Sequence, residues 1–219
     1  MARLEVFFDP LCPCAWITSR VTEEVACQRE LDVSWRLICL RIVNEQRDYD
    51  KDFPPEYVNA HTGGMKALRV AAAIHHQEGS EAVGRYYTEL GTRWHDQRRS
   101  RDEVRKGDFS SVAEAVRAAG LATHLADEVN DEAMDTFLRS ETATALARTG
   151  ADVGTPVITF SPGAPDEASI FGPVIARVPR DDEALRIWDA MELLTRTPGF
   201  AELKRSQRDA PAFGMRDHR

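Results

Sequence analysis

Residues 9–16 read Asp9-Pro10-Leu11-Cys12-Pro13-Cys14-Ala15-Trp16, and this stretch decides the fold. It follows a short apolar run over residues 4–8 and precedes a segment with helical periodicity. A cysteine before a proline at such a strand-to-helix junction faces the unpaired N–H groups of the first helical turn and the positive end of the macrodipole. This position can lower a cysteine pKa from about 8.5 to roughly 3.5–7.5, so we expect Cys12 to form a reactive thiolate.

The motif departs from the usual redox motif at its last position. Redox proteins built in this way usually carry Cys-x-x-Cys, whereas this chain has Cys12-Pro13-Cys14-Ala15. Pro13 is tolerated in the first helical turn because its missing N–H would have no partner there. Dithiol chemistry between Cys12 and position 15 is therefore impossible, and Cys14 is the second thiol of the motif.

The composition is that of a soluble globular protein. The chain has 219 residues, of which 42% are hydrophobic and 29% are charged, and its formal net charge is −8. Such a negative charge argues against nonspecific binding of nucleic acid or anionic membranes. No stretch approaches the roughly 20 apolar residues of a transmembrane helix, and the N-terminus lacks the pattern of a secretory signal. We expect a cytoplasmic protein with no nucleic-acid or membrane partner.

The four cysteines do not indicate a disulfide framework, because a reducing cytoplasm disfavours one. Zinc needs about four ligands at suitable spacing, and Cys12-x-Cys14 has no matching Cys or His pair downstream. We therefore expect no bound metal. Cys27 lies late in the first helical segment and Cys39 in an apolar strand, so both are expected to be buried small hydrophobic residues.

The order of secondary structure indicates an α/β protein interrupted by helices. A strand over 4–8, a helix over 13–29 and a strand over 32–40 form a βαβ unit with a right-handed crossover. Helices are then predicted over 64–78, 80–97, 108–119, 122–128 and 131–148. An antiparallel hairpin and two helices follow, over 156–160, 169–173, 180–194 and 198–205.

Two domains are expected from this order. Residues 1–60 and 150–219 should form a small mixed sheet covered by helices. A connection of roughly 85–90 residues is too long for a loop, so residues 61–149 should pack as an inserted helical domain. The polar residues 206–219 are expected to fray.

Thr155-Pro156 stands directly before the third strand, where an X–Pro bond is mildly biased towards cis. Together with Cys12-Pro13, the inserted helices and Val153-Gly154, it makes the sequence resemble the DsbA-like branch of the thioredoxin superfamily. The resemblance implies a thioredoxin-like fold, βαβ…ββα, in which Pro156 is cis and faces the nucleophilic Cys12. The sequence is similar, more narrowly, to the mycothiol-dependent nitroreductases, over residues 8–13, 16–20, 44–48, 152–156, 171–174 and 202–205.

This resemblance implies small-thiol chemistry and a set of site residues. Cys12 would be the nucleophile, with mycothiol or a glutathione-like thiol as co-substrate and no tightly bound cofactor. Substrate or thiol would lie beside Thr155 and Pro156. Asn44 and Tyr57, in the loop that enters the insertion, could contact substrate, or could equally be a loop-capping Asn and a half-buried Tyr.

Two further side chains belong to the candidate site. Trp16 follows the motif on the apolar side of its helix, and a core position is favoured for it over a substrate contact. His95 lies in an amphipathic helical segment, where a solvated surface histidine is favoured over a thiol-binding one.

Three mechanisms are compatible with Ala15 in place of a cysteine. In the first, Cys12 forms a mixed disulfide that a second thiol molecule releases. In the second, Cys14 resolves Cys12, although residues two apart on a helix point to different sides and their bridge would be strained. In the third, Cys12 only orients a bound thiol, as serine does in the related kappa-class transferases and chromene-carboxylate isomerases.

The favoured function is a cytoplasmic, DsbA-like thiol–disulfide oxidoreductase that depends on mycothiol and reduces a nitroaromatic or another small electrophile. The alternatives are a transferase or isomerase that uses a thiol cofactor, and a redox-inert binding module with a thioredoxin fold. The expected partners are the small thiol and a small electrophile or disulfide, and a homodimer is compatible with the sequence.

Overall fold

The computed structural model describes residues 1–97, 103–104 and 106–213 and contains a four-stranded mixed sheet. The strands are β1 (Ala2–Phe8), β2 (Leu31–Leu37), β3 (Val157–Phe160) and β4 (Ala168–Phe171), in the order β2-β1-β3-β4. β1 runs parallel to β2 and antiparallel to β3, and β3 pairs with β4 antiparallel. The predicted βαβ unit, the hairpin and the α/β class are therefore confirmed.

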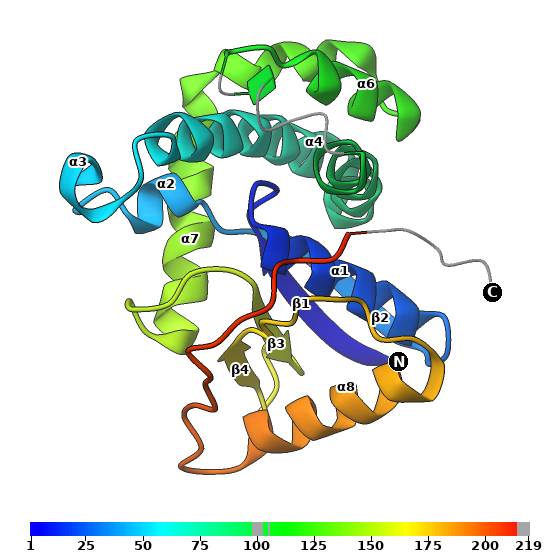
Figure 1. Ribbon diagram of the computed structural model, residues 1–219. Helices are drawn as coiled ribbons and strands as arrows, with labels where there is room; N and C mark the ends of the chain where they lie inside the picture. Colours follow the sequence, from blue (N-terminus) through cyan, green and yellow to red (C-terminus); the bar gives the residue numbers. More distant parts are fainter. Residues whose placement is uncertain (98–102, 105, 214–219) are drawn as a thin grey trace.

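Helices cover both faces of the sheet, as Figure 1 shows. α1 (Pro13–Ala26) and α8 (Asp181–Arg196) pack on one face, and α7 (Asp135–Thr149) packs on the other. Phe7 and Phe8, which are neighbours in β1, are both fully buried. Successive side chains of a strand point to opposite faces, so each of the two rings enters a different core layer.

An ionic network holds α7 to its face of the sheet. Arg36 of β2 donates to Glu141 of α7 at 2.6 Å and pairs with Glu5 of β1 at 2.5 Å. Arg148 of α7 pairs with Glu5 as well. Glu141 is only 6% exposed, so its negative charge depends on these partners for compensation. The last helix of the predicted insertion thus contributes directly to the layers around the sheet.

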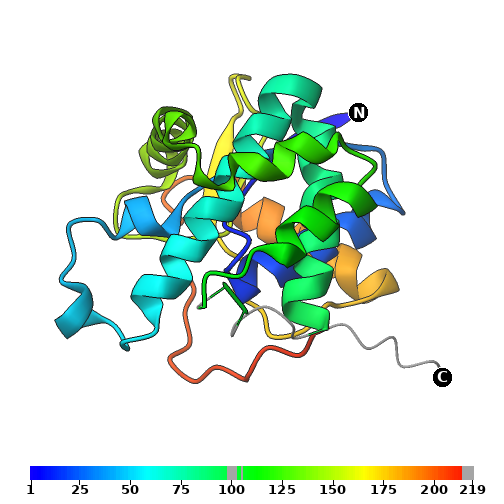
Figure 2. The ribbon, with the colours of Figure 1, turned by 90° about the horizontal axis from the view of Figure 1, so that it is seen from above.

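The remaining inserted helices lie above the sheet in Figure 1 and surround α4 (Tyr57–Gly91). α4 consists of two helices joined at Gly79, where a φ of 82° interrupts the helical backbone. The predicted break at this glycine is therefore confirmed. The segments around it are α2 (Leu40–Val43), α3 (Tyr49–Asp52), the π-helical turn η1 (Thr92–Asp96), α6 (Ser110–Ala118), and the 3₁₀ segments η2 (Thr123–Asn130) and η3 (Glu132–Met134). Figure 2 shows α6 and the segments after it lying across α4.

The end of α4 lies very close to the first turn of α1 and fixes its position. A Cβ atom at Gly91 would lie only 2.2 Å from the ring of Trp16, so only glycine admits this contact. Tyr87, one turn earlier on α4, stacks on Phe8 with ring centroids 3.7 Å apart. Trp16 meets Tyr87 edge to face, so one aromatic cluster joins β1, α1 and α4 beneath the cysteine motif.

The predicted helix over residues 198–205 is wrong. α8 ends at Arg196, and Gly199 adopts a φ of 82°, after which residues up to 213 form neither helix nor strand. Of the two large apolar side chains in residues 198–205, Phe200 is only half-buried and Leu203 is 77% exposed. A short helix is marginal in water unless it buries an apolar face, and two apolar side chains in eight residues do not form one.

Candidate active site at the start of helix α1

A buried carboxylate organises the loop between β1 and α1. Asp9 is completely buried, and its two carboxylate oxygens accept hydrogen bonds from the backbone N–H groups of Leu11 and Leu40, each at 2.9 Å. Its carbonyl oxygen accepts from the N–H of Cys12 at 3.0 Å. Burial raises the pKa of Asp9 to about 6, against the lowering effect of the two N–H donors. Asp9 therefore ties the cysteine loop to the start of α2.

Cys12 is the N-cap residue of α1, and Pro13 is the first residue of that helix. The backbone of Cys12 is extended, with φ −74° and ψ 116°. Its Sγ donates to the carbonyl oxygen of Thr155 at 3.4 Å, and the Thr155–Pro156 peptide bond is cis. The structure thus brings together three of the residues that the sequence singled out, Cys12 from one end of the sheet domain and Thr155 and Pro156 from the other.

The thiols of Cys12 and Cys14 form a hydrogen-bonded pair, and both residues are half-buried. The hydrogen bond from Cys12 lowers the pKa of Cys14 to about 7, with burial opposing it and the positive charge of Arg208 assisting it. The same contact and burial raise the pKa of Cys12 well above its ordinary value. The interaction between the two thiols therefore favours the negative charge on Cys14 over Cys12.

Two expectations about this pair are wrong. Cys12 does not hold the lowered pKa, because the interaction of the two thiols lowers the pKa of Cys14 and raises that of Cys12. The argument that the two side chains point to different sides also fails. It assumed helical backbone at both positions, whereas the extended backbone of the cap residue turns the Cys12 thiol towards Cys14.

The other two cysteines are also free thiols, with different surroundings. Cys39 is buried as predicted, and burial raises its pKa to about 12. Cys27 was expected to be buried, and this is wrong: α1 ends at Ala26, so Cys27 follows the helix and is exposed. Among the described residues, no group of His, Cys, Asp and Glu is arranged to hold a metal ion. In that same part of the chain, no helix is sufficiently long and apolar to cross a bilayer.

Trp16 and His95 pack against each other next to the cysteine loop. Trp16 is buried in the core, as favoured from the sequence, and its Nε1 donates to Asp96 at 2.9 Å. His95 was expected to be solvated, and this is wrong because only 4% of it is exposed. The π-helical turn at the end of α4 rotates it inwards, where its Nε2 donates to the carbonyl oxygen of Pro10 at 2.9 Å. Its ring also stacks on that of Trp16, with centroids 5.9 Å apart.

Asn44 and Tyr57 lie on the insertion side of the site. Asn44 donates from Nδ2 to the carbonyl oxygen of Leu40 at 2.8 Å, so it caps α2. Tyr57 is 42% exposed, and its ring contacts those of Phe53 and His61, with centroids 5.8 and 5.4 Å away. The hydrogen bond supports the loop-capping interpretation of Asn44, whereas Tyr57 is more exposed than the half-buried position considered for it. The role of both residues in binding stays a prediction.

Sequence reasoning missed two residues of the site. Asp9 had a usable signal, because an acidic residue directly after a buried apolar strand needs compensating N–H donors. Arg208 had no such sequence signal, since it lies in a polar segment that was expected to fray. Its effect on Cys14 comes from the path of the chain after α8.

The sequence is similar to one family model and to a curated protein. Residues 11–205 match the family model described as Rv2466c-like, mycothiol-dependent nitroreductase Rv2466c. The uncharacterized protein Rv2286c of Mycobacterium tuberculosis (strain ATCC 25618 / H37Rv) is 24% identical over 220 residues, which cover 96% of this chain and 84% of that protein.

Solved structures show the same fold at low identity. A 2-hydroxychromene-2-carboxylate isomerase aligns with a TM-score of 0.57 and 14% identity, over 89% of this chain and 96% of its own. The cytosolic disulfide reductase DsbM from Pseudomonas aeruginosa aligns with a TM-score of 0.52 and 17% identity, over 87% and 99%. At these identities the likeness establishes the fold alone, and the predicted thioredoxin-like fold is confirmed.

Proposed function

This chain belongs to the Rv2466c-like, mycothiol-dependent nitroreductase family, and we propose that it is a thiol–disulfide oxidoreductase driven by a low-molecular-weight thiol. The electron source would be mycothiol or a glutathione-like thiol, and the electron acceptor a small disulfide or electrophile. The placement of Cys12 carries the proposal: it is the N-cap residue of α1, its Sγ lies 3.4 Å from the carbonyl oxygen of Thr155, and its thiol interacts with that of Cys14.

Cys12 is the proposed nucleophile, and Cys14 is the group that activates it. At pH 7 about half of the molecules hold a single proton on the pair, and its transfer from Cys12 to Cys14 creates a thiolate at Cys12. This thiolate attacks one sulfur of a disulfide R–S–S–R, forms Cys12–S–S–R and releases RS⁻. The leaving thiolate takes the proton back from Cys14 as RSH.

Cys14 then acts as the resolving thiol. Its regenerated thiolate attacks Sγ of Cys12, forms the Cys12–Cys14 disulfide and expels the second RS⁻. The substrate disulfide has gained two electrons and the protein pair has lost two. Two molecules of the small thiol then reduce the pair and leave as their own disulfide. The hydrogen bond between the two thiols supports this route over release by a second thiol molecule alone.

Reduction of a nitroaromatic is the narrower version of the same chemistry. The dithiol supplies two electrons and two protons, which convert R–NO₂ into R–NO and water and leave the Cys12–Cys14 disulfide. Support for this version comes from the family of the chain, whose name carries that activity. We expect a protein in the cytoplasm, where the small-thiol pool keeps the pair reduced.

A thiol-dependent transferase or isomerase is the second candidate, and one observation favours it. The raised pKa of Cys12, caused by Cys14 and by burial, keeps this thiol protonated at neutral pH. A protonated Cys12 could donate a hydrogen bond to the thiolate of a bound cofactor without reacting with it. Ala15, in the position of the usual second cysteine, agrees with this role.

A turnover assay separates the two candidates. Reduction of bis(hydroxyethyl) disulfide, with mycothiol or glutathione as the electron source, is measured for wild type, Cys12→Ser, Cys14→Ser and Cys27→Ser. We expect loss of turnover in Cys12→Ser, strong reduction in Cys14→Ser, and full activity in Cys27→Ser, whose thiol is exposed beyond the end of α1. Turnover that consumes no thiol and survives Cys12→Ser would instead establish the isomerase or transferase.

A further inference from the structure

A cavity lies along one side of α1, separate from the reacting thiols. Its volume is about 380 Å³, and its walls come from α1, from η1, from the segment between β4 and α8, and from residues 212–213. Neither Cys12 nor Cys14 is among the described residues that line it. Small-molecule sites in proteins have volumes of roughly 300–1,000 Å³, so this cavity is large enough for a small ligand.

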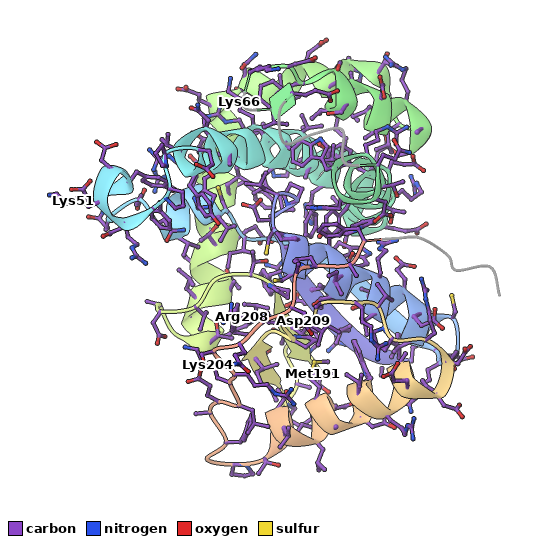
Figure 3. The ribbon with its side chains drawn as sticks, in the orientation of Figure 1. Lys51, Lys66, Met191, Lys204, Arg208 and Asp209 are labelled. Carbon is purple, nitrogen blue, oxygen red and sulfur yellow. The ribbon has the colours of Figure 1, made fainter. Side chains whose placement is uncertain are left out.

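The end of the chain closes one side of the cavity. After α8 the chain runs back across the molecule, in front of the sheet in Figure 1, and Figure 3 labels Arg208 on this part. The backbone N–H of Ala212 then donates to the carbonyl oxygen of Ala176 at 2.6 Å. The ring of Phe213 packs on that of His95, with centroids 5.4 Å apart. These two contacts hold Ala212 and Phe213 in the cavity wall.

Two aromatic rings belong to the apolar part of the wall. Trp16 of α1 is buried and lines the cavity, as Phe213 does. Both rings contact the ring of His95, at centroid distances of 5.9 and 5.4 Å. Ile17 and Val178 add aliphatic surface. Contact between aromatic rings is favourable beyond the area that it buries, so these walls favour a ligand with a ring-sized apolar body.

Arg20 brings a positive charge to this cavity without a carboxylate to balance it. Its guanidinium group lies over the ring of Trp16, 4.2 Å from the centroid. Nε donates to Ser19 at 3.2 Å, and Nη2 donates to Thr88 at 3.0 Å. In the part of the chain that the structure describes, Arg20 forms no ion pair and its Nη1 makes no hydrogen bond. The group is therefore fixed in direction and keeps N–H donors in the planar fork that matches a carboxylate.

Asp96 brings a negative charge to the same cavity. Its Oδ1 accepts from Nε1 of Trp16 at 2.9 Å, whereas its Oδ2 has no hydrogen-bond partner among the described residues. Arg20 and Asp96 form no ion pair with each other, although both contact Trp16, one over the face of the indole and one at its edge. Because Trp16 is buried, it holds these opposite charges apart in one cavity, where a ligand can bridge them.

The other charged groups decide which kind of ligand fits. Arg180 is already paired with Glu24 at 2.9 Å, so this pair adds no net charge. Glu23 is exposed and forms no ion pair with a described residue. The unpaired charges that line the cavity are therefore one positive, at Arg20, and two negative, at Asp96 and Glu23. A ligand that is only anionic would meet a net negative wall, and a ligand that also carries a positive group would not.

We propose that this cavity is a second binding site, which takes a small zwitterion with a ring-sized apolar body, such as an aromatic amino acid. Arg20 holds the carboxylate of this ligand, Asp96 holds its ammonium group, and Trp16 and Phe213 contact its ring. The site lies outside the cysteine pair, so the proposal does not rest on the proposed function.

Three probes that share a benzene ring and differ in charge test the proposal on the full chain. L-Phenylalanine carries both charged groups, 3-phenylpropionate lacks the ammonium group, and 2-phenylethylamine lacks the carboxylate. Their dissociation constants are measured by NMR titration at neutral pH and low salt. We expect L-phenylalanine to bind about tenfold more tightly than either of the other probes, because each charge-assisted hydrogen bond contributes a factor of this order.

Single variants assign each charge to its residue. Arg20→Gln should weaken the binding of L-phenylalanine and 3-phenylpropionate about tenfold and should not weaken that of 2-phenylethylamine. Asp96→Asn keeps an oxygen that can accept from Trp16, and it should weaken L-phenylalanine and 2-phenylethylamine but not 3-phenylpropionate. Arg29→Gln is the matched control, because this exposed arginine beyond the end of α1 pairs with Asp189 and does not line the cavity.

Equal affinities of the three probes for wild type, or no binding of L-phenylalanine at millimolar concentrations, would overturn the proposal, and this comparison needs no variant to fold. A loss in Arg29→Gln as large as that in Arg20→Gln would overturn it as well. The double variant Cys12→Ser/Cys14→Ser should bind L-phenylalanine as wild type does, and a loss there would place the probe at the cysteine pair instead. Binding needs no turnover, so a wild type that reduces no disulfide would refute the proposed function and leave this site to be decided by the titrations.

Discussion

Replacing Cys12 by alanine removes the hydrogen bond that lowers the pKa of Cys14. In the wild type this pKa is about 7 instead of 9.0, an ionisation constant roughly 100-fold larger. The bond from Cys12 is the largest cause, so we expect the pKa of Cys14 to rise to about 9 in Cys12→Ala. Cys12→Ser keeps a donor at the same position and should give a value between the two.

The size of the effect depends on which quantity is measured. At pH 7 the thiolate fraction of Cys14 should fall from about half to about 1%. A thiolate of higher pKa is also more nucleophilic, with a Brønsted slope of about 0.4–0.5, so the alkylation rate at that pH falls only roughly sixfold. The midpoint of the pH profile is therefore the sensitive observable, because nucleophilicity does not move it.

The assay is a short iodoacetamide pulse at a series of pH values between about 5 and 10, with Cys14 quantified by mass spectrometry. Cys27→Ser is the background, and Cys39 does not interfere because its pKa is about 12. A midpoint near 7 in wild type that stays near 7 in Cys12→Ala would refute the coupling of the two thiols. So would a wild-type midpoint close to 9.

Three further predictions concern stability, each measured by urea denaturation. Burial raises the pKa of Asp9 from 3.8 to about 6, so the native state is destabilised by up to ~3 kcal/mol as pH rises through this window, and Asp9→Asn should abolish that loss. Gly91→Ala places a Cβ atom 2.2 Å from the ring of Trp16 and should cost about 1–3 kcal/mol. Glu141→Ala removes a buried partner of Arg36 and should cost about 3–5 kcal/mol.

Each of these predictions has an outcome that would contradict it. Parallel pH profiles for wild type and Asp9→Asn would mean that the carboxyl group titrates normally in the native state. An unfolding midpoint unaffected by Gly91→Ala would mean that Trp16 can move away from α4 without cost. A loss well below 1 kcal/mol in Glu141→Ala would mean that solvent or Glu5 compensates Arg36 fully.

Local sequence signals predicted much of the fold and part of the site. Apolar runs and helical periodicity located the strands and most helices, because the period of the side chains follows directly from the backbone geometry. Cys12-Pro13 located the cap of α1, and Thr155-Pro156 located the start of β3. These two dipeptides lie 143 positions apart, counted from Cys12 to Thr155, and meet because β1 and β3 are neighbours in the sheet.

The features that could not be predicted depend on backbone detail or on long-range packing. The Cys12–Cys14 contact requires the extended backbone of one cap residue, which a helical periodicity does not encode. The inward direction of His95 requires a π-helical turn, where the assumed period of an α-helix fails. Residues 206–213 are held by the backbone hydrogen bond of Ala212 and by the ring of Phe213, and neither contact leaves a pattern in this polar sequence.

Intact mass spectrometry of the cysteine pair tests the central claim most directly. Wild type, Cys12→Ser and Cys14→Ser, each in the Cys27→Ser background, are reduced, then exposed briefly to mycothiol disulfide or glutathione disulfide. The dithiol route predicts that wild type loses two hydrogen atoms without gaining an adduct, and that Cys14→Ser retains one molecule of the small thiol on Cys12. A stable adduct on wild type, or a wild type that never reacts, would contradict a redox pair formed by Cys12 and Cys14.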